Sequence, residues 1–348
     1  NGRNLLNCFG CVNLNNKSYH FMNNPLSQDE YKKKVLEIMG SYEKIEKFKK
    51  EFEKFILNFP MRQNNNIKTV NSTGDYLFEC RNVRDSFEVT KSENCRFIFS
   101  SKEIKDSVGT LGYGSSSELM LEVVATGTSN NIIGSYGVEQ SQNILYGFYT
   151  NKCTDCIGCD GLKDGKYAIL NKEYTKEEYE RLREKIIKEL TEQDLYGLMI
   201  SSELAPFAYN ETIAQDNFPL TKEQAQGEGL RWEDDIQKTE GKETIKTSDI
   251  PDNIKDVLES IVSEVLACVE CNRNYKITDA EFLFYKKMVL PIPRRCFYCR
   301  HKDRVVRRGP YKFWDRNCAK CDIGITTNYA PERPEIVYCE KCYQQEVY

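Results

Sequence analysis

The sequence predicts an α+β protein, with a β-solenoid body, flanking helices and two small metal-binding modules at the C-terminus. Three observations support this prediction. Short strand-like segments recur at a short, nearly constant interval through much of the first half of the chain. A longer segment occurs twice at an offset of 148 residues, and each copy leads into a helix signal. Four CxxC pairs fall in the last quarter of the chain. Regular short periods are typical of solenoids, and paired CxxC motifs are typical of metal sites.

The composition is that of an ordinary globular protein. The chain has 348 residues, of which 40% are hydrophobic and 29% charged, and this length predicts two to three domains. No apolar run approaches the ~20 residues of a membrane span. Fifteen cysteines, an odd number clustered as CxxC, favour reduced thiols and a cytoplasmic location over a disulfide scaffold. The first residue is Asn rather than Met, so we expect a longer chain, from which a targeting segment could have been removed.

An internal repeat relates residues 7–31 to residues 155–179. The matched positions in the two copies are Cys8 and Cys156, Cys11 and Cys159, Leu14 and Leu162, Tyr19 and Tyr167, Asn23 and Asn171, and Tyr31 and Tyr179. The constant offset indicates that both copies form the same strand-turn-helix module.

Each copy ends in a capping-box sequence, in which a Ser or Thr is followed three residues later by Glu. The Ser27 box predicts a long helix over residues 28–58 that ends before Pro60, and the Thr175 box predicts a helix over residues 176–191.

Between the two copies, a polar residue repeatedly precedes a short apolar run. These polar residues are Asp85, Asn94, Asp106, Glu118, Asn131, Asn143 and Asp155. Short strands bounded by Gly, Asn and Ser predict a β-solenoid. We expect two units, about 24 residues, to form one coil, and the coils to stack because one coil alone cannot bury its inner face.

The cysteines of this region have two interpretations. Small buried side chains that point inward are favoured for Cys80, Cys95, Cys153, Cys156 and Cys159, since free Cys behaves as a small hydrophobe. The alternative is a third metal site formed by the last three. The same inward orientation is expected for Cys8 and Cys11 in the first repeat copy.

Residues 192–262 are expected to form a linker region with some structure. A short helix is predicted to start at Thr221, after Pro219. The polar stretch 237–250 is expected to be a loop, and Asp252 to cap a helix over about 252–265.

The C-terminal CxxC pairs supply the predicted metal ligands. They are Cys268, Cys271, Cys296, Cys299, Cys318, Cys321, Cys339 and Cys342. Four thiolates around one point select zinc or iron, and they leave no position open for water. We therefore expect two structural zinc ions, with rubredoxin-like iron as the minor alternative. A helix near 278–287 and a zinc-ribbon hairpin of strands 323–329 and 336–338 are predicted around them.

The chain is strongly basic between these motifs. Residues 294–320 contain ten Lys and Arg against two Asp. The predicted nucleic-acid contacts are Arg294, Arg295, Arg300, Lys302, Arg304, Arg307, Arg308, Lys312 and Arg316. Arginine suits phosphate, and the neighbouring aromatic residues Tyr311, Phe313 and Trp314 can stack on bases. The segment thus favours contact with RNA, DNA or a ribonucleoprotein. The alternative is that these arginines pair with acidic residues such as the run 233–235.

No catalytic constellation can be singled out. The two histidines, His20 and His301, are far apart in sequence, and the Gly-rich segment 109–114 lacks a P-loop lysine. A non-catalytic nucleic-acid-binding protein is therefore the first hypothesis. A protein-interaction scaffold that uses the solenoid surface is the second, and an enzyme acting in the solenoid groove is the third.

Residues 266–308 resemble small bacterial zinc-ribbon domains, and residues 318–343 resemble the companion ribbon. The whole chain is similar to uncharacterised Cys-rich proteins of candidate-phylum bacteria. The resemblance implies that each site joins two consecutive CxxC pairs. Where such ribbons often carry Gly after a knuckle, this chain has Asn272 and Asp322. Both residue types tolerate the left-handed conformation, so the knuckle turns should form.

These patterns together predict five segments. They are a first repeat module with its helix at 1–60, a β-solenoid at 61–165, a second repeat helix and linker at 166–265, and zinc ribbons at 266–308 and 309–348.

Overall fold

The computed structural model describes residues 2–347. It contains both helices and strands, in agreement with the predicted α+β class. The chain divides into two compact units, one formed by residues 64–207 and the other by the segments before and after it. Within the described residues, no helix combines the length and apolar character needed to cross a membrane.

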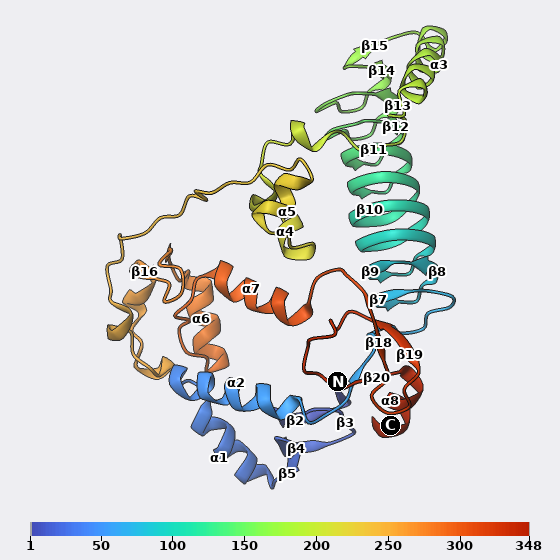
Figure 1. Cartoon of the computed structure of the whole chain (residues 1–348). Helices are drawn as coiled ribbons and strands as arrows, with labels where there is room; N and C mark the ends of the chain where they lie inside the picture. The colour runs from blue at the N-terminus through green and yellow to red at the C-terminus, as the bar shows by residue number, and fades with distance from the viewer. Residues whose placement is uncertain (1, 348) are drawn as a thin grey trace. The chain divides into compact units, whose positions relative to one another are not determined.

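A stack of parallel strands forms most of the 64–207 unit (Figure 1). Its strands are β7 (Gly74–Phe78), β8 (Arg81–Arg84), β9 (Ser86–Thr90), β10 (Glu93–Gly127), β11 (Asn130–Glu139), β12 (Gln142–Leu145), β13 (Thr154–Ile157) and β14 (Lys166–Ile169). Gly74 lies beside Ser86, and Thr154 lies beside Lys166. Side chains that bond across neighbouring coils, such as those of Asn82 and Asn94, are likewise 12 residues apart. The prediction of a coil twice as long was therefore wrong.

The short coil arises from its backbone, because left-handed residues recur at every third position through much of the stack. Asn82, Asp85 and Glu88 all have φ between 50° and 56°. Such a residue turns the chain after each short extended step, so the coil closes after four steps. Asn tolerates this conformation, and the side chain of Asn82 also donates to Asn94 Oδ1 of the next coil at 3.0 Å. Asn94 donates in turn to Asp106 Oδ1 at 2.9 Å.

Between the left-handed positions, every third side chain points into the coil and is small or aliphatic. Ser129 is 4% exposed; its hydroxyl donates to Gly127 O at 2.9 Å and accepts from Ser141 N at 3.2 Å. The thiol of Cys153 likewise donates to Asn151 O at 3.4 Å. The five cysteines of this unit are all buried, which confirms the interpretation of inward-facing side chains.

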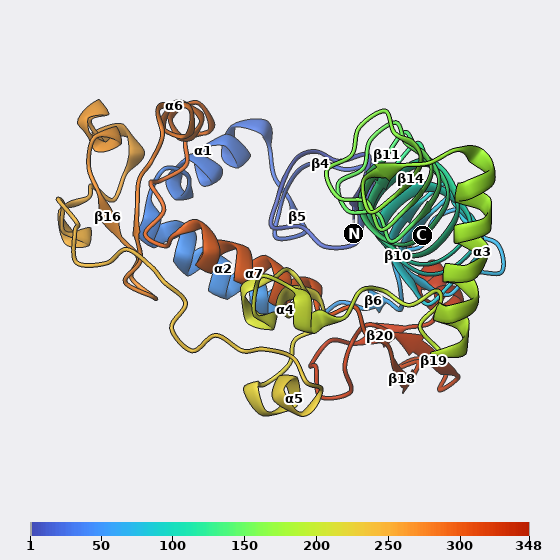
Figure 2. The same ribbon diagram turned by 90° about the horizontal axis from the view of Figure 1, so that it is seen from above.

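The C-terminal end of the stack is covered by β15 (Lys172–Glu173), which runs antiparallel to β14, and by α3 (Lys176–Glu192). Figure 2 looks along the stack and shows α3 against one side. Tyr179 of α3 is 2% exposed and packs with Leu145, Ile157 and Ile169. The predicted capping box of Thr175 is present. A 3-10 turn, η1 (Ser202–Leu204), follows.

The first repeat copy has the same construction. Its strands are β1 (Gly2–Arg3), β2 (Leu6–Phe9), β3 (Leu14–Asn15), β4 (Ser18–Phe21) and β5 (Asn24–Pro25). Leu6 pairs in parallel with Ser18, which is again one coil length further along the chain. The side chain of Asn23 bonds the backbone N–H and C=O of Val12, as Asn171 does with Asp160. The internal repeat is therefore structural.

The long helix predicted over 28–58 is two helices, α1 (Gln28–Ile38) and α2 (Tyr42–Ile56). Gly40, which has φ 87°, interrupts the helical backbone between α1 and α2. Ser41 then caps α2, and its side chain accepts from Lys44 N. Asp252 accepts from Glu43 N at 2.9 Å and from Ser41 Oγ at 2.5 Å. It thus caps α2, and the helix expected over 252–265 is replaced by 3-10 turns.

The rest of this unit consists of short elements. They are β6 (Met61–Arg62), η2 (Tyr209–Glu211), α4 (Ala214–Asn217), α5 (Lys222–Gly227), η3 (Thr247–Asp249), η4 (Ile254–Asp256), η5 (Glu259–Val262), β16 (Leu266–Ala267), β17 (Asn274–Tyr275), α6 (Asp279–Met288), α7 (Phe297–Arg308), β18 (Trp314–Asn317), β19 (Gly324–Thr327), β20 (Val337–Tyr338) and α8 (Glu340–Val347). The predicted short helix after Thr221 and the predicted helix near 278–287 are confirmed by α5 and α6. The predicted ribbon hairpin was wrong, because β19 pairs with β18 and β20 pairs with β6.

Candidate metal centres and the basic helix

The first candidate metal centre brings together two cysteines that follow β16 and two cysteines at the start of α7. Cys268 and Cys271 follow β16, and Cys296 and Cys299 lie at the start of α7. Their four Sγ atoms all lie within 4.8 Å of one another, and Cys271 Sγ is 3.7 Å from Cys296 Sγ. This arrangement suits a tetrahedral ion with four thiolate ligands.

The second centre repeats this plan with Cys318, Cys321, Cys339 and Cys342. Their Sγ atoms also lie within 4.8 Å of one another, and Cys321 Sγ is 3.8 Å from Cys339 Sγ. The first pair precedes β19 and the second pair lies at the start of α8. Both clusters have the pairing that the resemblance implied. They are the two such clusters in the described residues, and neither includes Cys153, Cys156 or Cys159.

The knuckle turns form as expected from Asn272 and Asp322. Both residues have φ 60°. The backbone N–H of Asn272 donates to Cys268 O at 3.0 Å, and that of Asp322 donates to Cys318 O at 2.9 Å. The left-handed residue lets the chain reverse directly after the second sulfur, so both sulfurs of a pair face one point.

Backbone N–H donors stabilise the thiolate form of the first cysteine of each centre. Burial disfavours the thiolate of Cys268, but hydrogen bonds from the backbone of Cys296 and Cys271 outweigh it and lower its pKa to about 6. The pKa of Cys318 is lowered to about 6 for the same reasons. A thiolate is the form of cysteine that binds metal, so the donor set fits a thiophilic ion.

The basic residues at the edges of the segment support the fold. Arg294 is 6% exposed, and its guanidinium donates to Ile250 O at 2.7 Å and Pro251 O at 3.0 Å. Arg316 donates to Ala330 O and Glu335 O at 3.2 and 3.3 Å. These two guanidinium groups are occupied by backbone carbonyls.

Three further arginines are held by side chains around α7. Arg295 forms ion pairs with Glu270 and Asp303. Arg300 donates to Tyr285 Oη at 3.3 Å. Arg308 donates to Asn217 Oδ1 at 2.6 Å. The expected partners at 233–235 are not used in these contacts, and Asp234 pairs with Lys222 instead.

The remaining predicted cations lie at the surface. Lys302, Arg304 and Arg307 are exposed on α7. Within residues 2–347 no acidic side chain forms an ion pair with Lys302 or Arg304, and Arg307 meets only Glu53, at 3.3 Å, where both side chains are more than half exposed. Lys312 lies 5.5 Å from the ring of Trp314.

Two aromatic residues within the CxxC pair at the start of α7 were not among the predicted contacts. Phe297 and Tyr298 are 58% and 61% exposed. The guanidinium of Arg304 lies 6.0 Å from the Phe297 ring centre, and that of Arg273 lies 4.6 Å from the Tyr298 ring centre. Tyr311, which was expected to be accessible, is only 7% exposed. The exposure of Phe297 and Tyr298 could have been inferred from the sequence, because both residues lie between Cys296 and Cys299, whose side chains turn inward.

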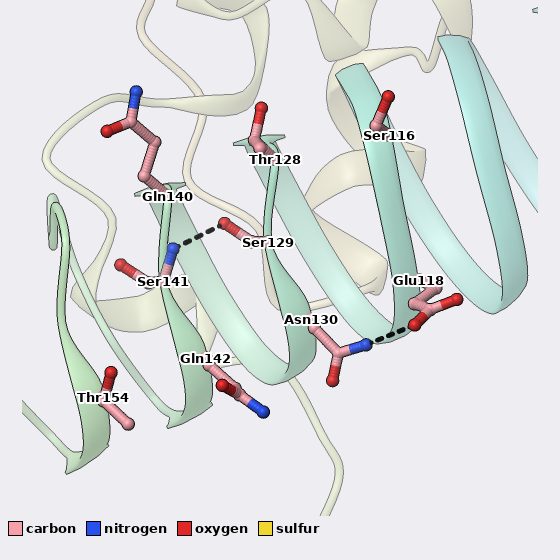
Figure 3. A pocket seen from close by; sticks show the side chains of 9 residues that line it. All are labelled: Ser116, Glu118, Thr128, Ser129, Asn130, Gln140, Ser141, Gln142 and Thr154. Atoms are coloured by element: carbon pink, nitrogen blue, oxygen red, sulfur yellow. Dashed lines mark hydrogen bonds between the residues drawn. The ribbon is translucent and has the colours of Figure 1, made fainter.

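The 64–207 unit carries a shallow groove of about 330 Å³ with polar walls (Figure 3). Ser, Thr and Gln recur at equivalent wall positions of successive coils, a pattern that is visible in the sequence once the coil length is known.

Comparisons with protein-family models, curated proteins and solved structures found no match to this chain. The likeness of the C-terminal region to zinc ribbons therefore rests on its two four-cysteine clusters.

Proposed function

We propose that the protein is a non-catalytic, zinc-stabilised protein that binds nucleic acid through the exposed residues of α7. The observation that carries this proposal is the combination of Lys302, Arg304 and Arg307 with Phe297 and Tyr298 on one metal-anchored helix. Cations attract phosphate, and exposed rings stack on bases.

Zinc is the metal we assign to both four-cysteine centres. Closed sites with four thiolates are typical of structural zinc. The core around the second centre is small, with Cys318, Ile325, Val337 and Cys342 as its buried members. A structural zinc ion contributes about 10–16 kcal/mol to folding in small modules. The ion thus makes α7 and α8 rigid supports.

We also assign the stack of short coils to the β-solenoid class. Parallel pairing at a constant register, inward side chains at every third position and a capped C-terminal end support this assignment. Its role in the proposed function is that of a rigid body joined to the binding module.

The nucleic-acid interface is smaller than the nine residues predicted from sequence. Arg294, Arg295 and Arg316 are committed to contacts within the protein. The binding energy should therefore come from three or four phosphate contacts on and near α7. Such a small set predicts modest affinity with a clear salt dependence.

The test is a titration of labelled single- and double-stranded RNA and DNA by fluorescence anisotropy at several salt concentrations. The variant Lys302→Gln/Arg304→Gln/Arg307→Gln removes three contacts. Between about 50 and 200 mM salt, three contacts account for about a 20- to 40-fold loss of affinity, so the variant should lose most of this dependence. The control replaces three exposed lysines of the other unit, Lys163, Lys185 and Lys188, by Gln. Equal effects of both triple variants would contradict the proposal.

A second candidate function is a protein-interaction scaffold in the 64–207 unit. The observation in its favour is that the segment after α3 leaves Leu198, Leu204 and Phe207 53–75% exposed. Exposed apolar patches often mark protein contacts. A partner recovered after nuclease treatment, and lost in Leu204→Asp/Phe207→Asp, would support this function.

A further inference from the structure

The groove of the 64–207 unit lies across successive coils and has two walls (Figure 3). Ser116, Thr128 and Gln140 form one row, and Asn130 and Gln142 belong to the other. Each row repeats once per coil. Neighbouring strands lie about 4.8 Å apart, so three coils span about 10 Å along the axis.

The walls are almost free of charge. Of the nine lining residues, Glu118 alone is ionisable, and its carboxylate accepts from Asn130 Nδ2 at 2.7 Å. The floor hydroxyls of Ser129 and Ser141 are buried and used within the coils. Contacts with a ligand would therefore come from neutral amides and hydroxyls of the walls.

Several of these wall groups are available. In the described part of the chain, the side chains of Gln140, Gln142 and Thr154 form no hydrogen bond, while both glutamines are exposed. A glutamine amide offers two donor hydrogens and an acceptor oxygen. The groove thus presents donors and acceptors in regular repetition, which suits a neutral ligand that carries both at every unit.

An aromatic residue lies beside the groove because one coil is one residue longer than its neighbours. Met120 N donates to Ser107 Oγ over 13 residues, whereas the equivalent bond from Ile104 N to Ser92 Oγ spans 12 residues. The additional residue lies between the inward positions Thr110 and Gly114, where Tyr113 is 61% exposed with φ 73°.

The ring of Tyr113 lies so close to Gly127 that a Cβ there would be 2.9 Å from it. Gly127 directly precedes Thr128 of the groove wall. The ring itself lies outside the groove, where Tyr113 lines a separate hollow with Glu88, Ser100, Ser101 and Lys102.

We propose that this groove binds a neutral, linear oligosaccharide that runs along the coil axis. Sugar hydroxyls both donate and accept, which matches the amide and hydroxyl walls. The spacing of the coils is close to the length of one sugar ring, so successive units meet equivalent side chains.

Isothermal titration with the full chain tests this proposal, using cellohexaose, xylohexaose and chitohexaose as neutral probes and oligogalacturonate as the acidic probe. Binding of at least one neutral probe at millimolar concentration is expected. Gln140→Ala/Gln142→Ala should weaken it about tenfold, while Tyr113→Ala, at a residue outside the groove, and Gln193→Ala, an exposed amide elsewhere, should not.

Circular dichroism and melting curves of each variant establish that the coils remain folded. If Tyr113→Ala fails to fold, Gln193→Ala remains as the control, and Gln140→Ala/Gln142→Ala still tests the groove because both glutamines lie at the surface. The proposal is overturned if no neutral probe binds, if the groove variant binds as the wild type does, or if the acidic probe binds more tightly than the neutral ones.

Discussion

Replacing Arg294 should destabilise the protein without directly removing a nucleic-acid contact. The side chain is 6% exposed, and it donates to the carbonyls of Ile250 and Pro251. Its guanidinium also lies 5.1 Å from the ring of Tyr42. In Arg294→Ala, the buried carbonyl of Ile250 and the half-buried carbonyl of Pro251 lose a charged donor, at about 1–3 kcal/mol each, and the aliphatic part of the side chain leaves a void.

The sum for Arg294→Ala is about 4 kcal/mol. In a unit of this size, about 1 kcal/mol shifts the melting temperature by about 2–4 °C, so a decrease of about 8–16 °C is expected. Melting of the zinc-loaded full chain, followed by circular dichroism, measures this shift.

Arg304→Ala is the matched control, because Arg304 lies on the solvent face of α7. It should change stability by less than about 0.5 kcal/mol but weaken RNA or DNA binding. An Arg294→Ala protein that melts like the wild type would refute the assignment of Arg294 as a structural residue. If Arg294→Ala melts like the wild type but no longer binds RNA or DNA, Arg294 would instead be a nucleic-acid contact.

Three further predictions concern the metal centres and the coils. Metal analysis should find two zinc ions per chain. Cys271→Ser should lose one of them, and Cys153→Ser should lose neither. A third ion that is lost in Cys153→Ser would instead support the alternative metal site of Cys153, Cys156 and Cys159. Ser129→Ala should lower the free energy of unfolding in urea by about 1–3 kcal/mol, because the buried N–H of Ser141 loses its acceptor while Gly127 O keeps the N–H of Gln140, and exposed Ser116→Ala should have little effect. Burial raises the pKa of Cys95 to about 11 from a reference of 9.0, so its contribution is complete below pH 9 and is lost as the pH rises toward 11. Between pH 8 and 11, the wild type should therefore lose about 2 kcal/mol more stability than Cys95→Ser, and parallel pH profiles would contradict this reasoning.

The features that formed as predicted depend on residues that are neighbours in the chain. The capping boxes of Ser27 and Thr175 join residues three positions apart and formed as predicted. The knuckles at Asn272 and Asp322 also depend on a few adjacent residues. Such interactions are encoded locally, because the partners are close in the chain whatever the rest of the fold does.

The failures occurred where the partner lies far away in the chain. Asp252 caps a helix through Glu43, which lies 209 residues earlier, and β20 pairs with β6 instead of β19. The predicted coil was twice as long as the observed one. The sequence shows how often a polar corner recurs, but the number of corners in one coil depends on the left-handed turns between them. Nothing local distinguishes the observed coil from one twice as long.

The sequence by itself determined the two four-cysteine clusters, the internal repeat and the presence of a stacked β region, because each is a short pattern repeated along the chain. The tertiary structure alone decided which basic residues remain available. Arg294 and Arg304 are both arginines in one basic segment, yet one is buried on the backbone carbonyls of residues 250 and 251 and the other lies in solvent. Charge is a property of the residue, whereas availability depends on which distant groups the fold brings beside it.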